Sequence, residues 1–422
     1  MVFFWSRPHF VLVGRLYGHS EGINSLSISN DGTVLASGGS DTLRLWDIVA
    51  CKELRPPFRP DHRVNVRGQV TCTSWLPTSD WRKTLIFATS VGYLIVWKES
   101  ESGAFKELSA HRVGTPEQVI SLSVSKPDTK SFRVALGTYE RWVHVFMYDD
   151  EIPGTPTAVF SIQLAGTIPK SIAFADNVRA DLIIFGMMDG RILTVHGQRG
   201  NILRSTNAFS QICGYAAFCP GRRLAVIDNS EDGFSVIDVA TGSLVRALPC
   251  PVNKTVPKQV AWAHHQKLII GGSDHGMLYV YNAETGQVTQ KLQHESSGFV
   301  QTVASFDGST ETLVMGGSST NYGSSKPYIS FWRMTHSRKY PRTSWGWLDI
   351  LTLAHAAFVL AFLVALLQPH VSRRLGLLLS SSLTNIDDSG DSTPNAQHEL
   401  RAVRAELEQM RHLVDGMPRG GR

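Results

Sequence analysis

Short segments in which apolar and polar residues alternate recur along most of the chain. The clearest group lies between Gly18-His19 and Trp46-Asp47 and contains the segments INSLSIS, TVLASGG and TLRLWD. Alternation with a period of two is typical of β-strands that bury one face, and the Asn-Asp-Gly and Ser-Asp steps between the segments favour tight turns. This group is predicted to be a small antiparallel sheet.

The last segment of this group recurs along the chain at regular intervals. Its seven copies close at Trp46, Trp97, Phe146, Val195, Ile237, Tyr281 and Trp332, so successive copies are 42 to 51 residues apart. Each copy follows an apolar segment that ends in small residues, such as LASGG or KLIIGGS. Seven units at this spacing predict an all-β fold, a seven-bladed β-propeller over residues 10–333.

The segment LASGGSDTLRLWD, with Gly18-His19 before it, resembles the WD-repeat family. The resemblance implies that His19, Ser37, Asp41 and Trp46 form a buried hydrogen-bonded network in the first blade, in which each polar group is paired. The turn after Asp41 is one residue shorter than in the family, and the other blades lack most of these polar residues. The resemblance therefore implies a fold and not an activity.

The two ends of the ring are predicted to meet in one blade. No strand is available between Trp332 and the following linker, whereas FVLVGRLY precedes Gly18 without a partner in its own blade. We predict that residues 10–16 supply the outer strand of the last blade. Residues 1–9 are predicted to be an N-terminal extension. They are not expected to begin a signal peptide, because Arg7-Pro8-His9 interrupts the apolar stretch that a signal peptide requires.

An apolar stretch, LDILTLAHAAFVLAFLVALL, occupies residues 348–367. Twenty helical residues span about 30 Å, the hydrocarbon thickness of a bilayer. Tryptophans precede the stretch, as is typical of membrane interfaces. One transmembrane helix is therefore predicted, with a helix buried against the propeller as the alternative. His355 within it is interpreted as a tolerated neutral side chain rather than a proton or metal ligand.

The flanks of this stretch predict its orientation. The linker over residues 334–347, with Arg333 before it, is basic and lacks acidic residues, whereas the following 15 residues hold only Arg373 and Arg374. The positive-inside rule then places the propeller in the cytosol and the tail in the lumen. A single-pass protein of an intracellular membrane is expected, with the endoplasmic reticulum favoured. The five scattered cysteines are expected to be free thiols.

The C-terminal tail divides into two parts. Residues 368–397 are predicted to be a flexible linker because their second half is polar and rich in Ser, Asp and Thr. Residues 398–415 are predicted to form a short amphipathic helix whose apolar seam is Leu400, Val403, Leu407, Met410 and Val414. Weak self-association as a coiled coil is one interpretation of this seam; a helix on the bilayer or one that frays in solution is the other.

Composition narrows the range of functions. With 42% hydrophobic and 18% charged residues the chain is not disordered as a whole, and a net charge of +5 does not indicate a nucleic-acid-binding protein. No phosphate-binding loop or nucleophile elbow occurs, so no catalytic residue, cofactor or metal is expected. In a strand, the adjacent His264 and His265 would point to opposite faces. The acidic clusters at residues 149–151 and 228–232 are interpreted as solvated loops.

Candidate binding residues come from the propeller itself. Trp142, Tyr93 and Met277 occupy equivalent positions at the start of their closing strands, and Arg141 precedes Trp142. Arg and Trp are common at interface hot spots, although local strand packing is the alternative. The prediction is a non-enzymatic, membrane-anchored scaffold that binds protein partners.

A second hypothesis rests on the order of the predicted segments along the chain. A propeller, one span and a short lumenal tail are similar to the endoplasmic-reticulum exchange factor for the COPII-coat GTPase. That resemblance implies a Gly-rich loop with a Lys that coordinates potassium, and the nearest segment here, Ser37-Gly38-Gly39-Ser40-Asp41, has no Lys.

Overall fold

The computed structural model describes residues 9–57, 64–79, 81–114, 116–126, 130–150, 154–187, 189–207, 213–319 and 326–336, together with His355 and Val359. The chain separates into two compact units, residues 1–338 and 339–422. The transmembrane stretch, except for His355 and Val359, and the whole tail seam from Leu400 to Val414 lie outside the described residues.

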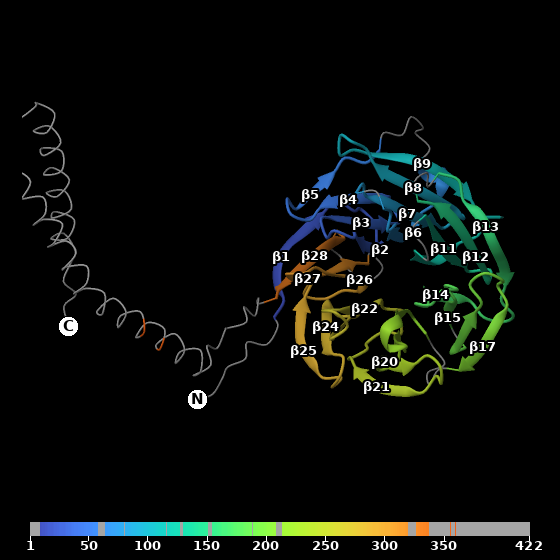
Figure 1. The fold of residues 1–422 in the computed structure, drawn as a ribbon. Helices are drawn as coiled ribbons and strands as arrows, with labels where there is room; N and C mark the ends of the chain where they lie inside the picture. The colour runs from blue at the N-terminus through green and yellow to red at the C-terminus, as the bar shows by residue number, and fades with distance from the viewer. Residues whose placement is uncertain are drawn as a thin grey trace, which may run out of the picture. The chain divides into compact units, whose positions relative to one another are not determined.

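In the described residues the strands form seven four-stranded antiparallel sheets arranged around a ring (Figure 1). The predicted seven-bladed propeller is therefore confirmed. Six of the sheets are meanders of four consecutive strands, and the seventh combines three consecutive strands with one strand from the other end of the chain. The alternation along the sequence produces these strands because every blade buries both faces against its neighbours in the ring.

The strands fall into four sets according to their place in the blade. The first, innermost strands are β2 (Ile23–Ile28), β6 (Val70–Trp75), β10 (Val119–Ser125), β14 (Pro169–Phe174), β18 (Ala216–Cys219), β22 (Val260–Ala263) and β26 (Val300–Asp307). The second strands are β3 (Val34–Gly39), β7 (Thr84–Thr89), β11 (Ser131–Thr138), β15 (Leu182–Gly186), β19 (Leu224–Asp228), β23 (Leu268–Gly271) and β27 (Glu311–Ser318).

The third strands contain the seven closing residues of the repeat. They are β4 (Leu43–Asp47), β8 (Tyr93–Glu99), β12 (Trp142–Asp149), β16 (Arg191–Val195), β20 (Gly233–Asp238), β24 (Met277–Asn282) and β28 (Tyr328–Thr335). The fourth, outermost strands are β5 (Lys52–Leu54), β9 (Phe105–Arg112), β13 (Thr157–Gln163), β17 (Ile202–Asn207), β21 (Leu244–Pro249), β25 (Val288–Gln293) and β1 (Val11–Tyr17). Two short 3₁₀ helices, η1 (Val64–Arg67) and η2 (Pro220–Arg222), lie in connections.

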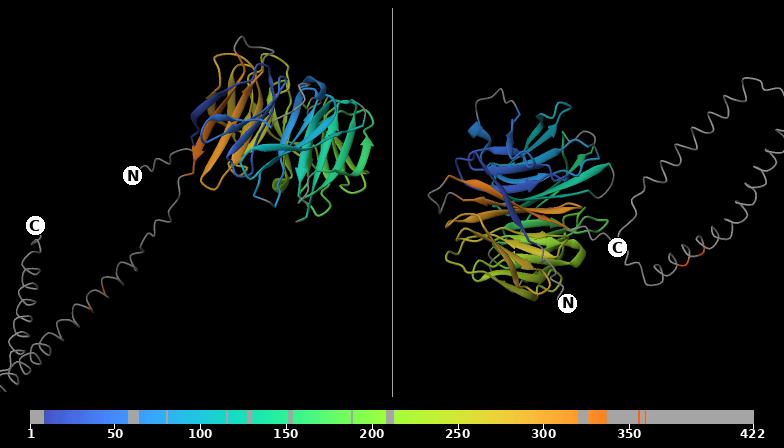
Figure 2. Two further views of the ribbon diagram at one scale, coloured as in Figure 1. Left: turned by 90° about the horizontal axis from the view of Figure 1, so that it is seen from above. Right: turned by 90° about the vertical axis from the view of Figure 1, so that its left-hand side faces the viewer.

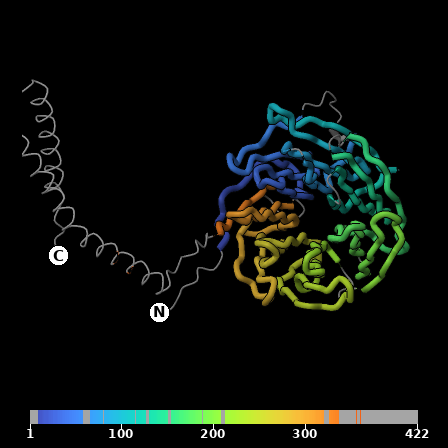
Figure 3. The backbone as a smooth tube through the Cα atoms, viewed as in Figure 1, coloured from blue at the N-terminus to red at the C-terminus, as the bar shows by residue number. Residues whose placement is uncertain are grey.

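The ring is closed by pairing between the two ends of the propeller. β1 runs antiparallel to β28, with Leu12 opposite Trp332 and Leu16 opposite Ile329, and it completes the sheet β1-β28-β27-β26. Figures 1 and 3 show the first and last strands of the propeller side by side. The seventh blade is therefore built from both ends of the chain, and the outer-strand position that residues 10–16 were predicted to fill is occupied by β1.

The hydrophobic core lies between blades, where the faces of adjacent sheets meet. Figure 2 shows how these sheets stand side by side around the ring. One cluster joins Leu16 and Phe331 of the seventh blade to Ile23, Leu35 and Trp46 of the first. Others join the sixth blade to the seventh and the fifth to the sixth in the same way. Each blade thus depends on its neighbours for burial, because a single sheet has no second layer of its own.

Two further expectations concern cysteines and the membrane. All five cysteines lie in described residues and none forms a disulfide, as predicted. Within the part of the chain that the structure describes, no helix combines the length and the apolar character needed to cross a bilayer. His355 and Val359 are both helical and exposed.

Candidate binding surfaces

The four residues of the WD signature meet in the first blade. His19 Nδ1 lies 2.7 Å from Asp41 Oδ1, and His19 Nε2 lies 2.7 Å from the Ser37 hydroxyl. The Trp46 indole donates to the same hydroxyl at 2.8 Å. His19, Ser37 and Trp46 are buried, so the chain of contacts pairs polar groups that water does not reach.

Asp41 anchors this network at the surface of the blade. Its carboxylate accepts hydrogen bonds from the backbone N–H groups of Ser20 and Thr42 as well as contacting His19. Although burial disfavours the charge, the bonds to His19 and Ser20 hold the pKa of Asp41 well below its ordinary value. The carboxylate is therefore ionised at neutral pH and fixes the turn between β3 and β4.

The same turn contains Gly38 and Gly39, which were compared above with the potassium-coordinating loop of the exchange factor. A Cβ on Gly39 would lie 2.5 Å from Asp41 Oδ1 and 2.8 Å from His19 Nδ1. Glycine is required at this position because the imidazole and the carboxylate occupy the space. The segment from Ser37 to Asp41 thus serves the structure of the blade.

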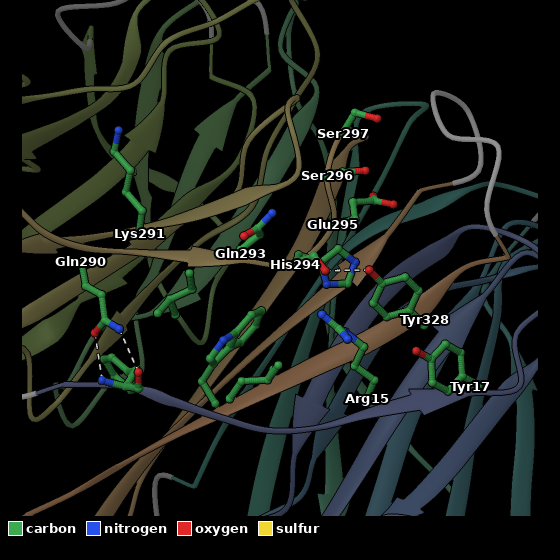
Figure 4. A pocket seen from close by; sticks show the side chains of 14 residues that line it. Arg15, Tyr17, Gln290, Lys291, Gln293, His294, Glu295, Ser296, Ser297 and Tyr328 are labelled. Carbon is green, nitrogen blue, oxygen red and sulfur yellow. Dashed lines mark hydrogen bonds between the residues drawn. The ribbon is translucent and has the colours of Figure 1, made fainter.

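A groove of about 620 Å³ runs along the seam between the sixth and seventh blades (Figure 4). It is lined by β1, by residues 290–297 and by Tyr328 and Trp332. Phe10 and Gln290 join its two sides through a pair of 2.8 Å hydrogen bonds, although they are 280 residues apart. The groove exists only because the chain ends close the ring.

A second buried histidine network lies at this seam. His294 contacts the hydroxyl of Ser318 through Nε2 at 2.6 Å and that of Ser330 through Nδ1 at 2.9 Å. The Tyr328 ring stacks on it at 4.4 Å, and Arg15 lies over Tyr328. Burial, helped by the positive charge of Arg15, lowers the pKa of His294 to about 4. This network was not predicted from the sequence; the signal for it was a histidine shortly before a first strand, as at His19.

The predicted binding residues lie on the face formed by the turns between second and third strands. Tyr93, Trp142 and Met277 each begin a third strand and are half-buried. Tyr93 and Trp142 belong to adjacent blades, the second and third, whereas Met277 lies in the sixth. Tyr93 and Trp142 therefore occupy equivalent positions in neighbouring blades, and Met277 packs on the core between the fifth and sixth blades.

This region also contains exposed residues that the sequence did not single out. Tyr139 is 51% exposed on the turn that holds Arg141, and Arg112 lies over the Tyr93 ring at 5.6 Å. Trp142 stacks on His144 at 5.8 Å. We call Tyr93, Arg112, Tyr139, Arg141 and Trp142 the aromatic patch.

The acidic clusters hold blades together. Asp150 is buried, accepts the Ser79 N–H from the second blade and lies 3.2 Å from Lys126 Nζ. Asp228 is fully buried 3.3 Å from Lys258 Nζ of the next blade, and burial raises the pKa of its carboxyl despite this cation. Asp150 and Asp228 were interpreted as parts of solvated loops; that interpretation is wrong for both.

The expected geometry of the adjacent histidines is also wrong. His264 and His265 lie in the turn after β22 and have positive φ angles of 52°, so they are not strand residues on opposite faces. The Asp307 carboxylate accepts both of their N–H groups at 2.7 Å, and His336 Nε2 lies 3.2 Å from His264 Nδ1. Among the described residues, no three His, Cys, Asp or Glu side chains are arranged to hold a metal ion.

The comparisons with known proteins agree with the geometry of the first blade. Protein groucho of Drosophila melanogaster is 31% identical to this chain over 78 residues, which cover 18% of this chain. The matched part spans about a tenth of the length of that relative. Residues 10–47 match the family described as WD domain, G-beta repeat. This match covers β1, which completes the seventh blade, together with β2, β3 and β4 of the first blade, so the segment similar to the family spans the closure of the propeller.

Proposed function

We propose that this protein is a non-enzymatic, membrane-anchored scaffold that binds protein partners through its propeller. The closed ring of seven complete blades is the observation that carries this proposal. A ring that buries its core between blades holds its turns on a rigid frame, and such surfaces suit protein recognition.

The anchor is the apolar stretch at residues 348–367, which begins 12 residues after the last described propeller residue, His336. A bilayer-length segment so close to the ring would concentrate bound partners at the membrane. The basic linker favours a cytosolic propeller with a lumenal tail, in the endoplasmic reticulum. The tail seam from Leu400 to Val414 would then provide weak self-association in the lumen.

The aromatic patch is the proposed site for the partner. It combines tyrosine, tryptophan and arginine, the residue types that contribute most to protein interfaces. Tyr139 and Arg141 are exposed, and their turn is held by the Arg141 N–H bond to the Thr138 carbonyl. An aromatic residue on a fixed turn loses little conformational entropy when it binds.

Proximity labelling from the full-length protein in its native cell tests this proposal. Tyr139→Ala combined with Arg141→Glu should remove a defined set of labelled proteins. The matched control is Val49→Ala with Lys52→Glu, which changes two exposed residues on the opposite turns of the first blade. Identical labelling by both variants would exclude the aromatic patch, and resistance to alkaline carbonate extraction tests the anchor separately.

A further inference from the structure

The turns that join first to second strands and third to fourth strands lie on one face of the ring, because every blade is an antiparallel meander. Backbone hydrogen bonds connect the two turns within a blade. Val239 N–H donates to the Arg223 carbonyl at 3.2 Å in the fifth blade, and Ala283 N–H donates to the Lys267 carbonyl at 2.9 Å in the sixth.

The seventh blade repeats this bond where the chain leaves the propeller. His336 N–H donates to the Thr310 carbonyl at 2.7 Å. His336 is followed directly by the linker to the apolar stretch. We therefore call this side of the ring the exit face.

On the exit face of the fourth to sixth blades, exposed basic side chains outnumber the exposed acidic ones, which are Asp176 and Glu284. Arg199, Arg222, Arg223 and Lys267 are all exposed in its turns. Within the described part of the chain, no acidic side chain lies within ion-pair distance of any of these four. Their charge is available to an anionic surface outside the molecule.

The first to third blades differ on this same face. Lys83 pairs with Asp31 at 3.2 Å and with Glu99 at 3.4 Å, and Lys126 pairs with the buried Asp150. The excess of positive charge is therefore local to one part of the exit face. It is not a property of the whole ring, whose net charge is small.

An exposed apolar side chain lies within this basic region. Val178, at the tip of the turn between β14 and β15, is 96% exposed. Its neighbour Arg179 contacts the Asp181 carboxylate at 2.9 Å, which fixes the turn. An exposed apolar tip on a face with an excess of basic residues suits the boundary between lipid headgroups and acyl chains.

We propose that the exit face of the fourth to sixth blades binds the surface of an anionic bilayer through Arg199, Arg222, Arg223 and Lys267. This proposal rests on the proposed membrane anchor. The 11 residues 337–347 can span at most about 40 Å, a length that lets the exit face reach the headgroups of a bilayer crossed by residues 348–367. A basic side chain near an anionic leaflet contributes roughly a fivefold factor in binding.

Hydrogen exchange of the full-length protein in lipid nanodiscs tests this binding. One set of nanodiscs contains phosphatidylcholine alone, and the other also contains phosphatidylserine. We expect amides in the turns at residues 196–201, 220–223 and 264–267 to exchange several-fold more slowly with phosphatidylserine. Molar salt should abolish this protection because the Debye length falls to about 3 Å. The turn at residues 139–141, on the other face, is the internal reference.

Two quadruple charge-reversal variants separate an effect of charge on lipid binding from an effect on folding. The quadruple variant R199E/R222E/R223E/K267E should lose the protection. K52E/K106E/K254E/K291E, which reverses four exposed charges outside the aromatic patch and outside the exit-face turns of the fourth to sixth blades, should keep it. An unchanged reference turn shows that each variant is folded, and the salt dependence of the wild type tests the proposal without any variant.

Three results would each contradict one part of the proposal: the lipid contact, the membrane anchor or the identity of the anionic partner. The nanodisc experiment distinguishes them. If the protein inserts into both nanodiscs and exchange is the same in each, the lipid contact is wrong while the anchor stands. If the full-length chain fails to insert into either, the proposed anchor is wrong. Protection by soluble heparin but not by phosphatidylserine would assign the basic region to an acidic macromolecule instead.

Discussion

Ser37 is the residue on which the buried network of the first blade converges. Its hydroxyl contacts both His19 and Trp46. Ser37→Ala would leave a buried imidazole nitrogen and a buried indole N–H without partners, so we expect a loss of about 2–4 kcal/mol in the free energy of unfolding. Chemical denaturation measures this loss. Ser102→Ala, at an exposed turn, should change stability by less than about 0.5 kcal/mol.

His294 should make the free energy of unfolding of the propeller depend on pH. Its pKa falls from 6.5 to about 4 on folding, so the unfolded state takes up a proton first as pH decreases. The contribution to stability is complete above pH 6.5 and is lost as pH falls towards 4. This loss amounts to about 3 kcal/mol.

The pH dependence of unfolding midpoints measures this contribution. His294→Gln should flatten the decrease in stability between pH 6.5 and 4. Replacement of the exposed His111 by Gln should leave the decrease unchanged. Equal slopes in the wild type and in His294→Gln would contradict the assignment.

The distance along the sequence decides which of these residues could be predicted. His19 and Trp46 lie within one repeat, so the local WD pattern was sufficient to identify their network. Arg15 and His294 meet only across the closed ring, and Lys258 reaches Asp228 from the next blade. No periodicity within a blade encodes contacts of this kind.

Among the elements, the second strands of the blades were the easiest to predict. β3, β7 and β15 are buried at every position, and their apolar runs stand out in the sequence. The outer strands lack this signal, since β17 and β21 are mostly exposed. Their pairing depends on the neighbouring third strand rather than on a hydrophobic face of their own.

β1 is the outer strand whose loss should matter most. Deletion of residues 1–17 would remove buried Leu16 and leave the edge of β28 without a partner. We expect a clearly lower melting temperature than for a deletion of residues 1–8, which stops short of β1. Equal melting temperatures for both deletions would show that β1 does not close the ring.

A substitution within β1 isolates its packing from its hydrogen bonds. Leu16 is 2% exposed and belongs to the core shared by the seventh and first blades. Leu16→Ala should cost about 2–5 kcal/mol of stability. Val13→Ala, at a position that is 42% exposed, should cost much less, and denaturant unfolding of the two variants measures the difference.

For the molecule as a whole, the architecture could be predicted further than the function. Seven copies of one strand pattern were enough to predict seven blades, because a propeller repeats the same burial in each blade. Binding surfaces arise where turns from different blades meet. Arg112 lies opposite Tyr93 across the β8–β9 hairpin, and Tyr139 shares a turn with Arg141. The strand pattern predicted Tyr93, Arg141 and Trp142, but it did not identify these two exposed neighbours.

The central claim is a scaffold held at a membrane with its propeller in the cytosol. Protease protection of the full-length protein in intact microsomes tests it most directly. We expect the propeller to be digested, whereas a tag after residue 422 should be protected until detergent is added. A propeller that survives in intact microsomes, with its C-terminal tag digested, would contradict the proposed topology.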